Sequence, residues 1–486
     1  MKLDCLMRNI EFKLLAGDMA VEINDITCDS RKVSHGDLFV CILGTKSDGH
    51  EFIQDAVAKG AAAIITEKEL DPLELPDGVT VISVESSRKA IAKIASIHFA
   101  NPVSKLTTVA ITGTKGKTTT AYMIKSILEK AGKSVGMIGT TGVYFGNVSY
   151  NIENTTPEPY ELNRIMAQMV EAGCEYLVME ASSQSVKMDR IYGMNFDYGV
   201  FTNLSPDHIG PGEHESIEEY IACKRKILEQ CDVLVLNEDD ELYPQMCCAG
   251  HKIIPYSVES AEPCLINNKP GMAYEFNGKK LQVGMPGVFS AYNAAAATSV
   301  CDALGVEHKY IEEGLETVKV MGRMEIVHSS NDLTVVIDFA HNGTSVMSVL
   351  ETLKPYCRGR LIAVFGAGGN RSCWRRYGMG QAAGKLADLC VITTDNPRWE
   401  KLSEINKWII EGVNAENGKY IEIDDRRDAI KYTIKTSQEG DMIVAFGKGH
   451  ENYIEIRGVK YDYSEHEEIK NAINEKYDFT KCTKMV

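Results

Sequence analysis

The fold is decided by a short glycine-rich stretch, Thr112-Gly113-Thr114-Lys115-Gly116-Lys117-Thr118. An apolar, β-branched run at residues 107–111 precedes it and predicts a strand. A helix is predicted directly after it, because apolar residues recur at i, i+3, i+4 and i+7 and a glycine follows: Ile124, Ile127, Leu128, Ala131 and Gly132.

This strand–loop–helix unit has the residues that hold phosphate. Glycines let backbone N–H groups approach a phosphate closely, a lysine neutralises its oxygens, and a threonine hydroxyl reaches Mg²⁺. Lys117 and Thr118 hold the last two positions, and the rest of the loop surrounds them: Gly113, Thr114, Lys115, Gly116 and Thr119. The usual spacing has a further glycine where this chain has Ile111. The context therefore predicts a shortened loop that binds the phosphates of ATP.

The rest of the chain predicts an α/β protein of three domains. Its 486 residues are too many for one hydrophobic core, and we expect domains at residues 1–104, 105–325 and 326–486. Strands are predicted at residues 37–42, 61–65, 176–179, 198–201 and 233–236, and further strands end near residues 337, 365, 393, 423 and 446. Alternation with helices predicts mostly parallel sheets, in a mononucleotide-binding central domain and a Rossmann-like third domain.

Composition limits the class of partner. A net charge of −16 argues against nucleic acid, which needs a positive field, but not against a small anionic substrate. The N-terminus has no apolar signal segment, and no apolar run is long enough for membrane insertion. Fourteen cysteines without a Cys-x-x-Cys pair read as reduced thiols. We expect a cytoplasmic monomer that acts on small molecules.

Lys224 lies at an unusual position for a cation. On a helix predicted over residues 217–228 it shares the apolar face: Ile217, Tyr220, Ile221, Ile227 and Leu228. A buried ammonium is costly unless it is paired or neutralised. The lysine either extends its charge to solvent from the rim of the core, or it is paired with an acid or a ligand, or it is chemically converted to an anion.

Two further polar positions follow predicted strands. Glu180 ends one strand, and Asp207-His208 follow another, so both reach the sheet edge that carries Thr118. A carboxylate and an imidazole at that edge could coordinate Mg²⁺. Taken singly, Glu180 also fits a cap or turn residue and His208 a loop histidine.

Polar clusters follow the strands of the third segment as well. Ligands of open α/β sheets bind beyond the carboxyl ends of strands, so the clusters indicate a site. Asp395-Asn396-Pro397-Arg398 reads either as the start of the next helix, capped by its acid or amide, or as a clamp in which Arg398 binds a carboxylate. Residues 447–451 read as a tight turn or as a backbone cradle in which Glu451 faces an ammonium.

Further motifs are spread along the whole chain: Asp29-Ser30-Arg31, Asn154-Thr155-Thr156-Pro157, Met179-Glu180-Ala181-Ser182-Ser183, Phe201-Thr202-Asn203-Leu204, Tyr220-Ile221-Ala222-Cys223-Lys224, Gly322-Arg323-Met324-Glu325 and Asp338-Phe339-Ala340-His341. With the glycine loop and the two clusters above, they resemble the Mur ligases of the MurE type. Those enzymes add the third peptide residue to the peptidoglycan precursor.

The resemblance implies a task for each domain. The first would bind the UDP end of the precursor through Ser30, Thr45, Lys46 and Ser47, and the central domain would bind its peptide through Asn154, Thr155, Thr156, Ser182 and Arg190. The central domain would also bind ATP, with Asn293 at the adenine, and the third domain would close over the nucleotide. Arg323 and Asp338 would lie at the sugar–phosphate end. The third would bind the incoming diamino acid through Arg376, Asp395, Asn396, Pro397, Arg398, Gly447 and Glu451.

The resemblance also resolves the lysine. It implies that Lys224 is carbamylated and, with Thr118, Glu180 and His208, coordinates two Mg²⁺ ions. Lys117, Lys224 and His208 would be the catalytic residues. The D-Glu carboxylate of UDP-N-acetylmuramoyl-L-Ala-D-Glu would attack ATP to form an acyl phosphate, and the amine of the third amino acid would then displace phosphate.

Three segments depart from the family pattern: Ser182 to Val186, Asp207 to His214 and Gly368 to Tyr377. They leave the details of substrate binding open. The Asp-Asn-Pro-Arg motif implies meso-diaminopimelate as the added amino acid. L-Lysine or another amino acid, a folylpolyglutamate-synthetase-like activity, and a non-catalytic paralogue that binds UDP-muramoyl peptides are the alternatives.

Overall fold

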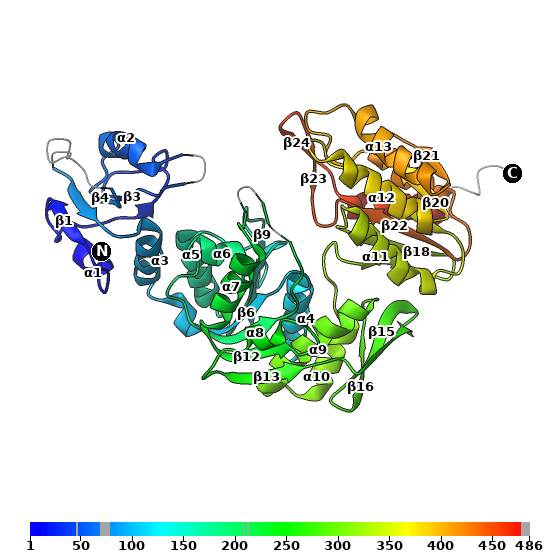
Figure 1. The fold of residues 1–486 in the computed structure, drawn as a ribbon, viewed down its shortest axis with the longest axis horizontal. Coiled ribbons are helices and arrows are strands. Elements are labelled where there is room, and N and C mark those ends of the chain that lie inside the picture. The colour runs from blue at the N-terminus through cyan, green and yellow to red at the C-terminus, as the bar shows by residue number, and fades with distance from the viewer. Residues whose placement is uncertain (45–46, 69–77, 208, 211–212, 478–486) are drawn as a thin grey trace. The chain divides into compact units, whose positions relative to one another are not determined.

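The computed structural model describes residues 1–44, 47–68, 78–207, 209–210 and 213–477. The chain divides into two compact units, Met1–Ser257 with Ala295–Ile311, and Val258–Ala294 with Glu312–Val486. Each unit contains parallel or mixed sheets with helices against their faces, and the second also contains small antiparallel sheets (Figure 1).

The first unit begins with a five-stranded sheet of order β1-β5-β4-β3-β2. Its strands are β1 (Lys13–Ala16), β2 (Ile26–Thr27), β3 (Leu38–Val40), β4 (Ala63–Thr66) and β5 (Thr80–Ser83), and its helices are α1 (Leu3–Leu6), η1 (Gly49–Phe52), α2 (Ile53–Ala58) and α3 (Ser87–His98). Alternate residues of β3 and β4 enter two different cores, with Leu38 and Val40 on one face and Phe39 on the other. Strands buried on both faces explain why the sequence reads as continuous apolar runs.

The first unit also holds an eight-stranded sheet of order β13-β12-β11-β6-β10-β7-β8-β9. Neighbours from β13 to β7 are parallel, and β8 and β9 are added antiparallel. The strands are β6 (Thr107–Thr112), β7 (Val135–Gly139), β8 (Gly142–Phe145), β9 (Val148–Tyr150), β10 (Tyr176–Glu180), β11 (Phe196–Phe201), β12 (Cys231–Asn237) and β13 (Lys252–Tyr256). The helices are η3 (Pro102–Lys105), α4 (Lys117–Lys130), α5 (Pro159–Glu171), α6 (Ser183–Lys187), α7 (Ile217–Leu228) and α8 (Tyr243–Met246).

The second unit combines a small and a large sheet. The small one is antiparallel, of order β14 (Ser260–Ile266), β15 (Lys269–Phe276) and β16 (Lys279–Val283). The large one has the order β17-β18-β22-β19-β20-β21, in which only the β17–β18 pair is antiparallel. Its strands are β17 (Glu325–Ser329), β18 (Leu333–Asp338), β19 (Leu361–Phe365), β20 (Leu389–Ile392), β21 (Tyr420–Glu422) and β22 (Asp441–Phe446).

Helices cover both faces of the six-stranded sheet. One core includes side chains of α11 (Gly343–Leu353), α12 (Cys373–Leu386) and α13 (Leu402–Ala415), and the other includes side chains of α14 (Arg426–Lys435) and α15 (Glu465–Tyr477). A hairpin of β23 (Tyr453–Ile456) and β24 (Val459–Asp462) follows β22, and η4 (Lys354–Tyr356) follows α11. The division between the units passes through α9 (Val288–Ala303) and α10 (His308–Thr317).

The predicted α/β class and the parallel sheets are confirmed. The helices predicted after the glycine loop and around Lys224 are α4 and α7, and each predicted strand end coincides with a strand to within a few residues. The predicted limits of the three domains stay a prediction. Within the part of the chain that the structure describes, none of the helices combines the length and the apolar character needed to cross a membrane.

Candidate functional site

The glycine loop connects β6 to α4, as its sequence predicts. Gly116 immediately precedes α4 with φ of +87°, and Gly113 has φ of +147°, so both occupy conformations that favour glycine. A Cβ on Gly113 would lie 1.9 Å from Thr202 Oγ1. Lys117 Nζ donates hydrogen bonds to Gly113 O at 2.9 Å and Thr114 O at 3.0 Å, so the ammonium folds back over the loop.

Glu180 lies beside this loop. Its Oε1 accepts hydrogen bonds from Thr118 Oγ1 at 2.9 Å and from Thr140 N at 2.8 Å, and its Oε2 accepts one from Thr140 Oγ1 at 3.1 Å. The side chain is 1% exposed. A Cβ on Gly139 would lie 2.2 Å from Glu180 Oε1, so a larger residue at the end of β7 would displace the Glu180 carboxylate from its hydrogen bonds. A buried carboxylate next to a threonine hydroxyl is a donor set that suits Mg²⁺.

Lys224 is buried on α7, at 2% exposure. Its Nζ donates a hydrogen bond to Gly113 O at 2.8 Å and lies 4.5 Å from the centre of the Tyr220 ring. The alternative in which this lysine extends to solvent is therefore wrong. Burial, together with the charge of Lys117, holds the pKa of Lys224 well below its ordinary value. A lowered pKa favours the neutral amine, which is the form that can add CO₂ to become a carbamate.

The structure does not describe every predicted residue of this cluster. His208 lies outside the described residues, while its neighbour Asp207 is described and its charge opposes the lowering of the Lys224 pKa. Sequence reasoning did not predict Gly139, Thr140 or Tyr220 as residues of this site. The hydroxyl of Tyr220 lies 3.1 Å from Thr114 Oγ1. Gly139 is the last residue of β7 and Thr140 follows it, and the parallel pairing of β7 with β10 brings both to Glu180.

The residues predicted to hold the peptide of the precursor gather around Glu180. Thr155 Oγ1 lies 3.1 Å from Thr140 Oγ1, and Thr156 Oγ1 donates to Glu180 O at 2.9 Å. Ser182 Oγ accepts from Thr156 Oγ1 at 3.3 Å, and Arg190 NH1 donates to Thr156 O at 3.2 Å. The segment with Asn154 precedes them directly.

Two residues predicted to hold the UDP end, Ser30 and Ser47, lie in loops of the part of the chain that carries the five-stranded sheet. Ser30 O accepts a hydrogen bond from Lys59 Nζ at 2.7 Å, and Ser47 O accepts one from Gly44 N at 3.0 Å. Thr45 and Lys46 lie outside the described residues. The binding role of this set stays a prediction.

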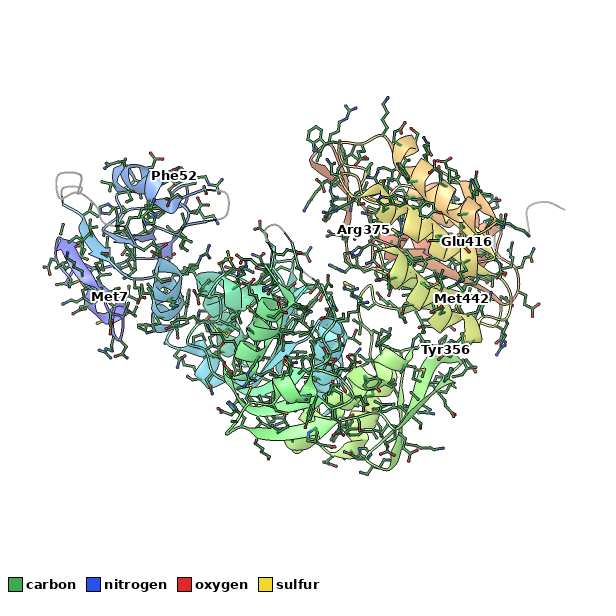
Figure 2. All side chains as sticks on the ribbon, in the orientation of Figure 1. Met7, Phe52, Tyr356, Arg375, Glu416 and Met442 are labelled. Atoms are coloured by element: carbon green, nitrogen blue, oxygen red, sulfur yellow. The ribbon has the colours of Figure 1, made fainter. Side chains whose placement is uncertain are left out.

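A cavity of about 120 Å³ lies at the carboxyl ends of the strands in the second unit. Six residues predicted to bind the amino acid line it: Arg376, Asp395, Asn396, Arg398, Gly447 and Glu451. Two further arginines line it, Arg371 and the Arg375 labelled in Figure 2, and sequence reasoning did not predict either of them as a contact. Four guanidinium groups around one small cavity favour an anionic ligand.

Salt bridges hold two of these arginines. Arg376 donates to Glu400 at 2.9 and 2.8 Å, and Arg398 Nε donates to Glu455 Oε2 at 3.0 Å. Arg398 NH1 also donates to Gly369 O at 2.9 Å. Both guanidinium groups are therefore fixed in place before a ligand arrives.

The prediction that Arg398 starts a helix is wrong. The next helix, α13, begins at Leu402 after Lys401, and Arg398 has φ of +51° and pairs with Ile456 of the hairpin. Pro397 therefore lies in the loop before that helix, and Asp395 and Asn396 do not cap it. The hairpin supplies backbone and carboxylate partners for Arg398 that the local sequence does not reveal.

The residues at 447–451 form a buried polar network with this loop. Lys448 Nζ donates to Asn396 Oδ1 at 2.7 Å and lies 3.2 Å from Glu451 Oε2, which also accepts from Asn396 Nδ2 at 2.9 Å. Glu451 thus faces an ammonium of its own chain. A Cβ on Gly447 would lie 2.3 Å from Asp395 Oδ2, so the strand end approaches the loop closely.

Three predicted nucleotide contacts belong to the second unit. Asp338 is buried and accepts hydrogen bonds from Met324 N at 2.8 Å and Ala340 N at 2.7 Å. Burial raises the pKa of Asp338, and the charge of Arg323 opposes the rise. Asn293 is buried within α9. The role of these residues at ATP stays a prediction.

Comparison with known proteins identifies the family of this chain. Three family descriptions match the chain: "Mur ligase family, catalytic domain" over residues 22–98, "Mur ligase middle domain" over residues 111–301 and "Mur ligase, glutamate ligase domain" over residues 322–449. The chain belongs to the Mur ligase family.

Relatives within the Mur ligases match nearly the whole chain. It is 39% identical over 485 residues to a UDP-N-acetylmuramoyl-L-alanyl-D-glutamate–2,6-diaminopimelate ligase of Caldanaerobacter subterraneus subsp. tengcongensis, covering 98% of this chain and 99% of that protein. A ligase of the same name, numbered 1, from Clostridium acetobutylicum is 39% identical over 481 residues, covering 96% and 98%. A solved structure of such a ligase has a TM-score of 0.69 at 26% identity and covers 98% of this chain and 99% of the other. The three-domain Mur ligase architecture is thereby confirmed.

Proposed function

We propose that this Mur ligase uses ATP to join meso-diaminopimelate to the D-Glu carboxylate of UDP-N-acetylmuramoyl-L-Ala-D-Glu. The observation that carries the proposal is the cluster of Lys117, Thr118, Glu180 and Lys224 at the start of α4, at the end of β10 and on α7. Its donors and acceptors match what phosphoryl transfer to a carboxylate requires. The similarity to diaminopimelate ligases over 98% of the chain supports the same reaction.

Charge repulsion is the physical problem of this reaction. A carboxylate must approach a triphosphate, and the loop N–H groups and Lys117 offset part of that repulsion. Thr118, Glu180 and a carbamylated Lys224 would hold Mg²⁺, with His208 as a further ligand, and the bound metal would neutralise phosphate oxygens. The buried hydroxyl and carboxylate, 2.9 Å apart, fit such an ion.

The bonds then change in two steps. A carboxylate oxygen of D-Glu bonds to the γ-phosphorus as the bond to the β-phosphate oxygen breaks, which gives an acyl phosphate and ADP. The amine nitrogen next bonds to the acyl carbon, phosphate leaves with the former carboxylate oxygen, and the nitrogen loses a proton. The residues around Glu180, namely Thr155, Thr156, Ser182 and Arg190, would orient the carboxylate that reacts.

The choice of amino acid rests on the arginine-lined cavity of the second unit. meso-Diaminopimelate carries a carboxylate at each end, whereas L-lysine has an ammonium without a carboxylate at its far end. Arg376 and Arg398 are held at the cavity wall and could each bind a carboxylate. The match of the description "Mur ligase family, catalytic domain" to residues 22–98, the segment in which we expect the UDP end to bind, supports a UDP-muramoyl substrate over folate.

A ligation assay tests the proposal. Purified protein is incubated with ATP, Mg²⁺ and the UDP-dipeptide, with meso-diaminopimelate or L-lysine as acceptor, and phosphate and UDP-tripeptide are measured. We expect both products with meso-diaminopimelate and at least tenfold less with L-lysine, because an unfilled charged site costs more than about 1.4 kcal/mol. A preference for L-lysine would contradict the choice of acceptor. Failure to release phosphate with either acceptor would favour the non-catalytic paralogue.

We also infer that the protein works as a monomer in the cytoplasm, where both nucleotide substrates are present.

A further inference from the structure

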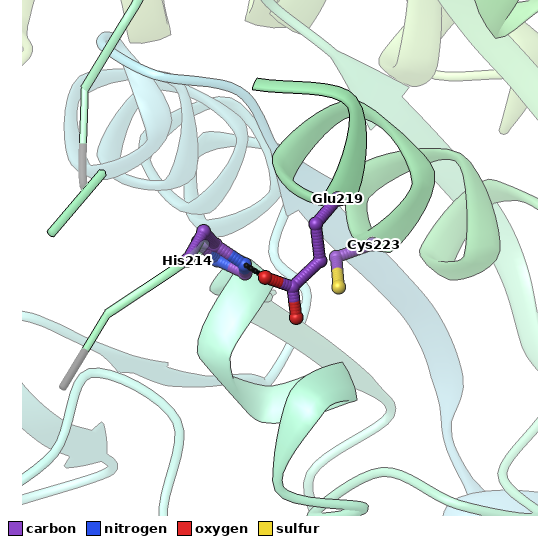
Figure 3. A group of neighbouring side chains, drawn as sticks. All are labelled: His214, Glu219 and Cys223. Atoms are coloured by element: carbon purple, nitrogen blue, oxygen red, sulfur yellow. Dashed lines mark ion pairs between the residues drawn. The ribbon is translucent and has the colours of Figure 1, made fainter. Parts of the chain in front are cut away.

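Three side chains of metal-ligand type lie together near the start of α7, apart from the predicted Mg²⁺ ligands: His214, Glu219 and Cys223 (Figure 3). One ligand atom of each lies within 4.8 Å of the other two. His214 Nδ1 and Glu219 Oε2 are 3.6 Å apart. Imidazole nitrogen, carboxylate oxygen and thiolate sulfur are the ligands that zinc takes in proteins.

The local sequence brings the three together. Glu219 and Cys223 are four residues apart on α7, so their side chains share one helix face. Ser216 caps the helix, since its Oγ accepts a hydrogen bond from Glu219 N at 3.2 Å. His214 lies two residues before that cap, and its Nδ1 lies beside Glu219.

Neighbouring contacts fix the orientation of the histidine. His214 Nε2 lies 2.9 Å from Ser183 Oγ, which is buried at the start of α6, and the ring lies 5.2 Å from the Tyr220 ring. The side chain of His214 is 0% exposed. Because Ser183 contacts Nε2, the other ring nitrogen, Nδ1, faces Glu219. In metal sites a hydrogen bond to one ring nitrogen likewise orients the histidine so that the other nitrogen can bind the ion.

The charge of Glu219 is balanced by a cation that can leave. Lys187 Nζ lies 2.9 Å from Glu219 Oε1, and Glu215 N donates to Oε2 at 2.7 Å. The side chain of Lys187 is 28% exposed, so its ammonium can turn to solvent when a divalent ion takes its place.

We propose that His214, Glu219 and Cys223 form a binding site for a divalent ion of the zinc class, with water as the fourth ligand. The ion bonds to His214 Nδ1, to a carboxylate oxygen of Glu219 and to Sγ of Cys223, and the thiol proton passes to solvent. Tetrahedral bonds of about 2.0–2.3 Å place ligand atoms roughly 3.5 Å apart, so the side chains must close by about 1 Å. The bound ion links the start of α7, the helix that carries Lys224, to His214 in the preceding segment, whose ring contacts Ser183 of α6.

Cobalt(II) is the probe that tests this site. The full-length protein, kept in excess Mg²⁺, is titrated with Co²⁺ while near-ultraviolet absorption is recorded. A charge-transfer band from thiolate to cobalt is expected at one equivalent, and the predicted Mg²⁺ ligands, which include no thiol, cannot produce it. Cys223→Ser should abolish the band, and His214→Gln and Glu219→Gln should weaken Co²⁺ binding by about tenfold or more. Cys301→Ser, which alters another buried thiol of the chain, is the matched control and should keep the band.

A second measurement covers the case in which Cys223→Ser does not fold. Zn²⁺ should raise the Tm of the unmodified protein and of Cys301→Ser, because an ion that binds only the folded state stabilises it. It should raise the Tm of His214→Gln by clearly less, because that variant binds the ion about tenfold more weakly. Absence of a thiolate band in the unmodified protein, a band that survives in Cys223→Ser, or an equal zinc effect in His214→Gln would each overturn the proposal. None of these readouts depends on ligase activity.

Discussion

At the scale of single residues, Lys224 shows what the helical spacing of apolar residues can and cannot predict. Its place on the apolar face of residues 217–228 predicted burial, and the structure confirms a side chain at 2% exposure. Periodicity could not predict the acceptor of its hydrogen bond, since Gly113 lies 111 positions earlier in the chain. The lowered pKa likewise depends on this packing and on Lys117. The same holds for Glu180, whose strand-end position was predicted but whose partner Thr140 was not.

Replacement of Lys224 by alanine should abolish most of the ligase activity. Loss of a metal-binding carbamate removes several kcal/mol of transition-state stabilisation, so kcat should fall by at least about 100-fold. A short carboxylate such as acetate, added in solution, should restore part of it by occupying the vacated place. Phosphate release with the complete substrate set is the measurement.

Lys226→Ala is the control for that variant, because this lysine lies two positions away on the same helix and is exposed. It should retain ordinary activity. Full activity of the Lys224→Ala enzyme without added carboxylate would refute the carbamate role.

At the scale of helices and strands, burial decides what the sequence reveals. The strands β6, β10, β11 and β22 are buried along their length and read as apolar runs. β9 and β14 are mostly exposed, so their sequences carry little signal, and no strand was predicted there.

The Arg398 prediction failed for another reason. Its Nε partner lies 57 residues later, in the β23–β24 hairpin, and no local rule for helix starts includes such a contact.

The hairpin should therefore influence binding of the amino acid. Glu455→Gln removes the charge that holds Arg398 Nε, while leaving Arg398 itself in the cavity wall. We expect the KM for meso-diaminopimelate to rise about tenfold, which corresponds to loss of about 1.4 kcal/mol from a charged hydrogen bond, with the KM for ATP unchanged. Val459→Ala, at an exposed position of the same hairpin, should change neither constant. Equal rises in both KM values would indicate general damage rather than positioning of Arg398.

The contact between α14 and α15 depends on a fully buried ion pair. Arg426 donates to Glu465 at 2.8 and 2.7 Å, both side chains are 0% exposed, and the Tyr463 hydroxyl also donates to this carboxylate. Glu465→Gln would leave the guanidinium buried without a counter-charge. The free energy of unfolding should fall by about 3–5 kcal/mol, as measured by urea denaturation.

A surface pair on the same two helices is the control. Arg427 and Glu468 lie 3.1 Å apart, and Arg427 is half exposed. Glu468→Gln should cost less than about 1 kcal/mol. A similar loss in both variants would contradict the special cost assigned to the buried pair.

At the scale of the whole molecule, the sequence motifs are distributed over two compact units. The glycine loop, Glu180 and Lys224 belong to the first, and the arginine-lined cavity to the second. Sequence motifs predicted both sites because each lies at strand ends of a parallel sheet. The division itself, which passes through α9 and α10, could not be predicted, because those helices give no composition change at residues 294 or 311.

The stability of the second unit should depend on pH through His466. This residue of α15 lies 2.9 Å from Glu325 of β17, and the hydrogen bond to that carboxylate raises the pKa of the histidine. A folded-state pKa above the unfolded value of about 6.5 means that the stabilisation is complete below that pH and is lost as pH rises through the folded-state pKa. Because the His466 side chain is 38% exposed, solvent screening keeps the pair below about 1 kcal/mol.

Calorimetry of His466→Gln across pH isolates this contribution. The unmodified protein should exceed the variant in Tm by a degree or so below about pH 6.5, and the difference should shrink as pH rises through the folded-state pKa of His466. Val459→Ala, which alters an exposed and non-titratable side chain of the same unit, should give a Tm difference that does not change over this range. An ion pair between His466 of α15 and Glu325 of β17 requires that the charged imidazole stabilises the unit. A Tm difference for His466→Gln that grows with pH would mean that the charged imidazole destabilises it, and would contradict this ion pair.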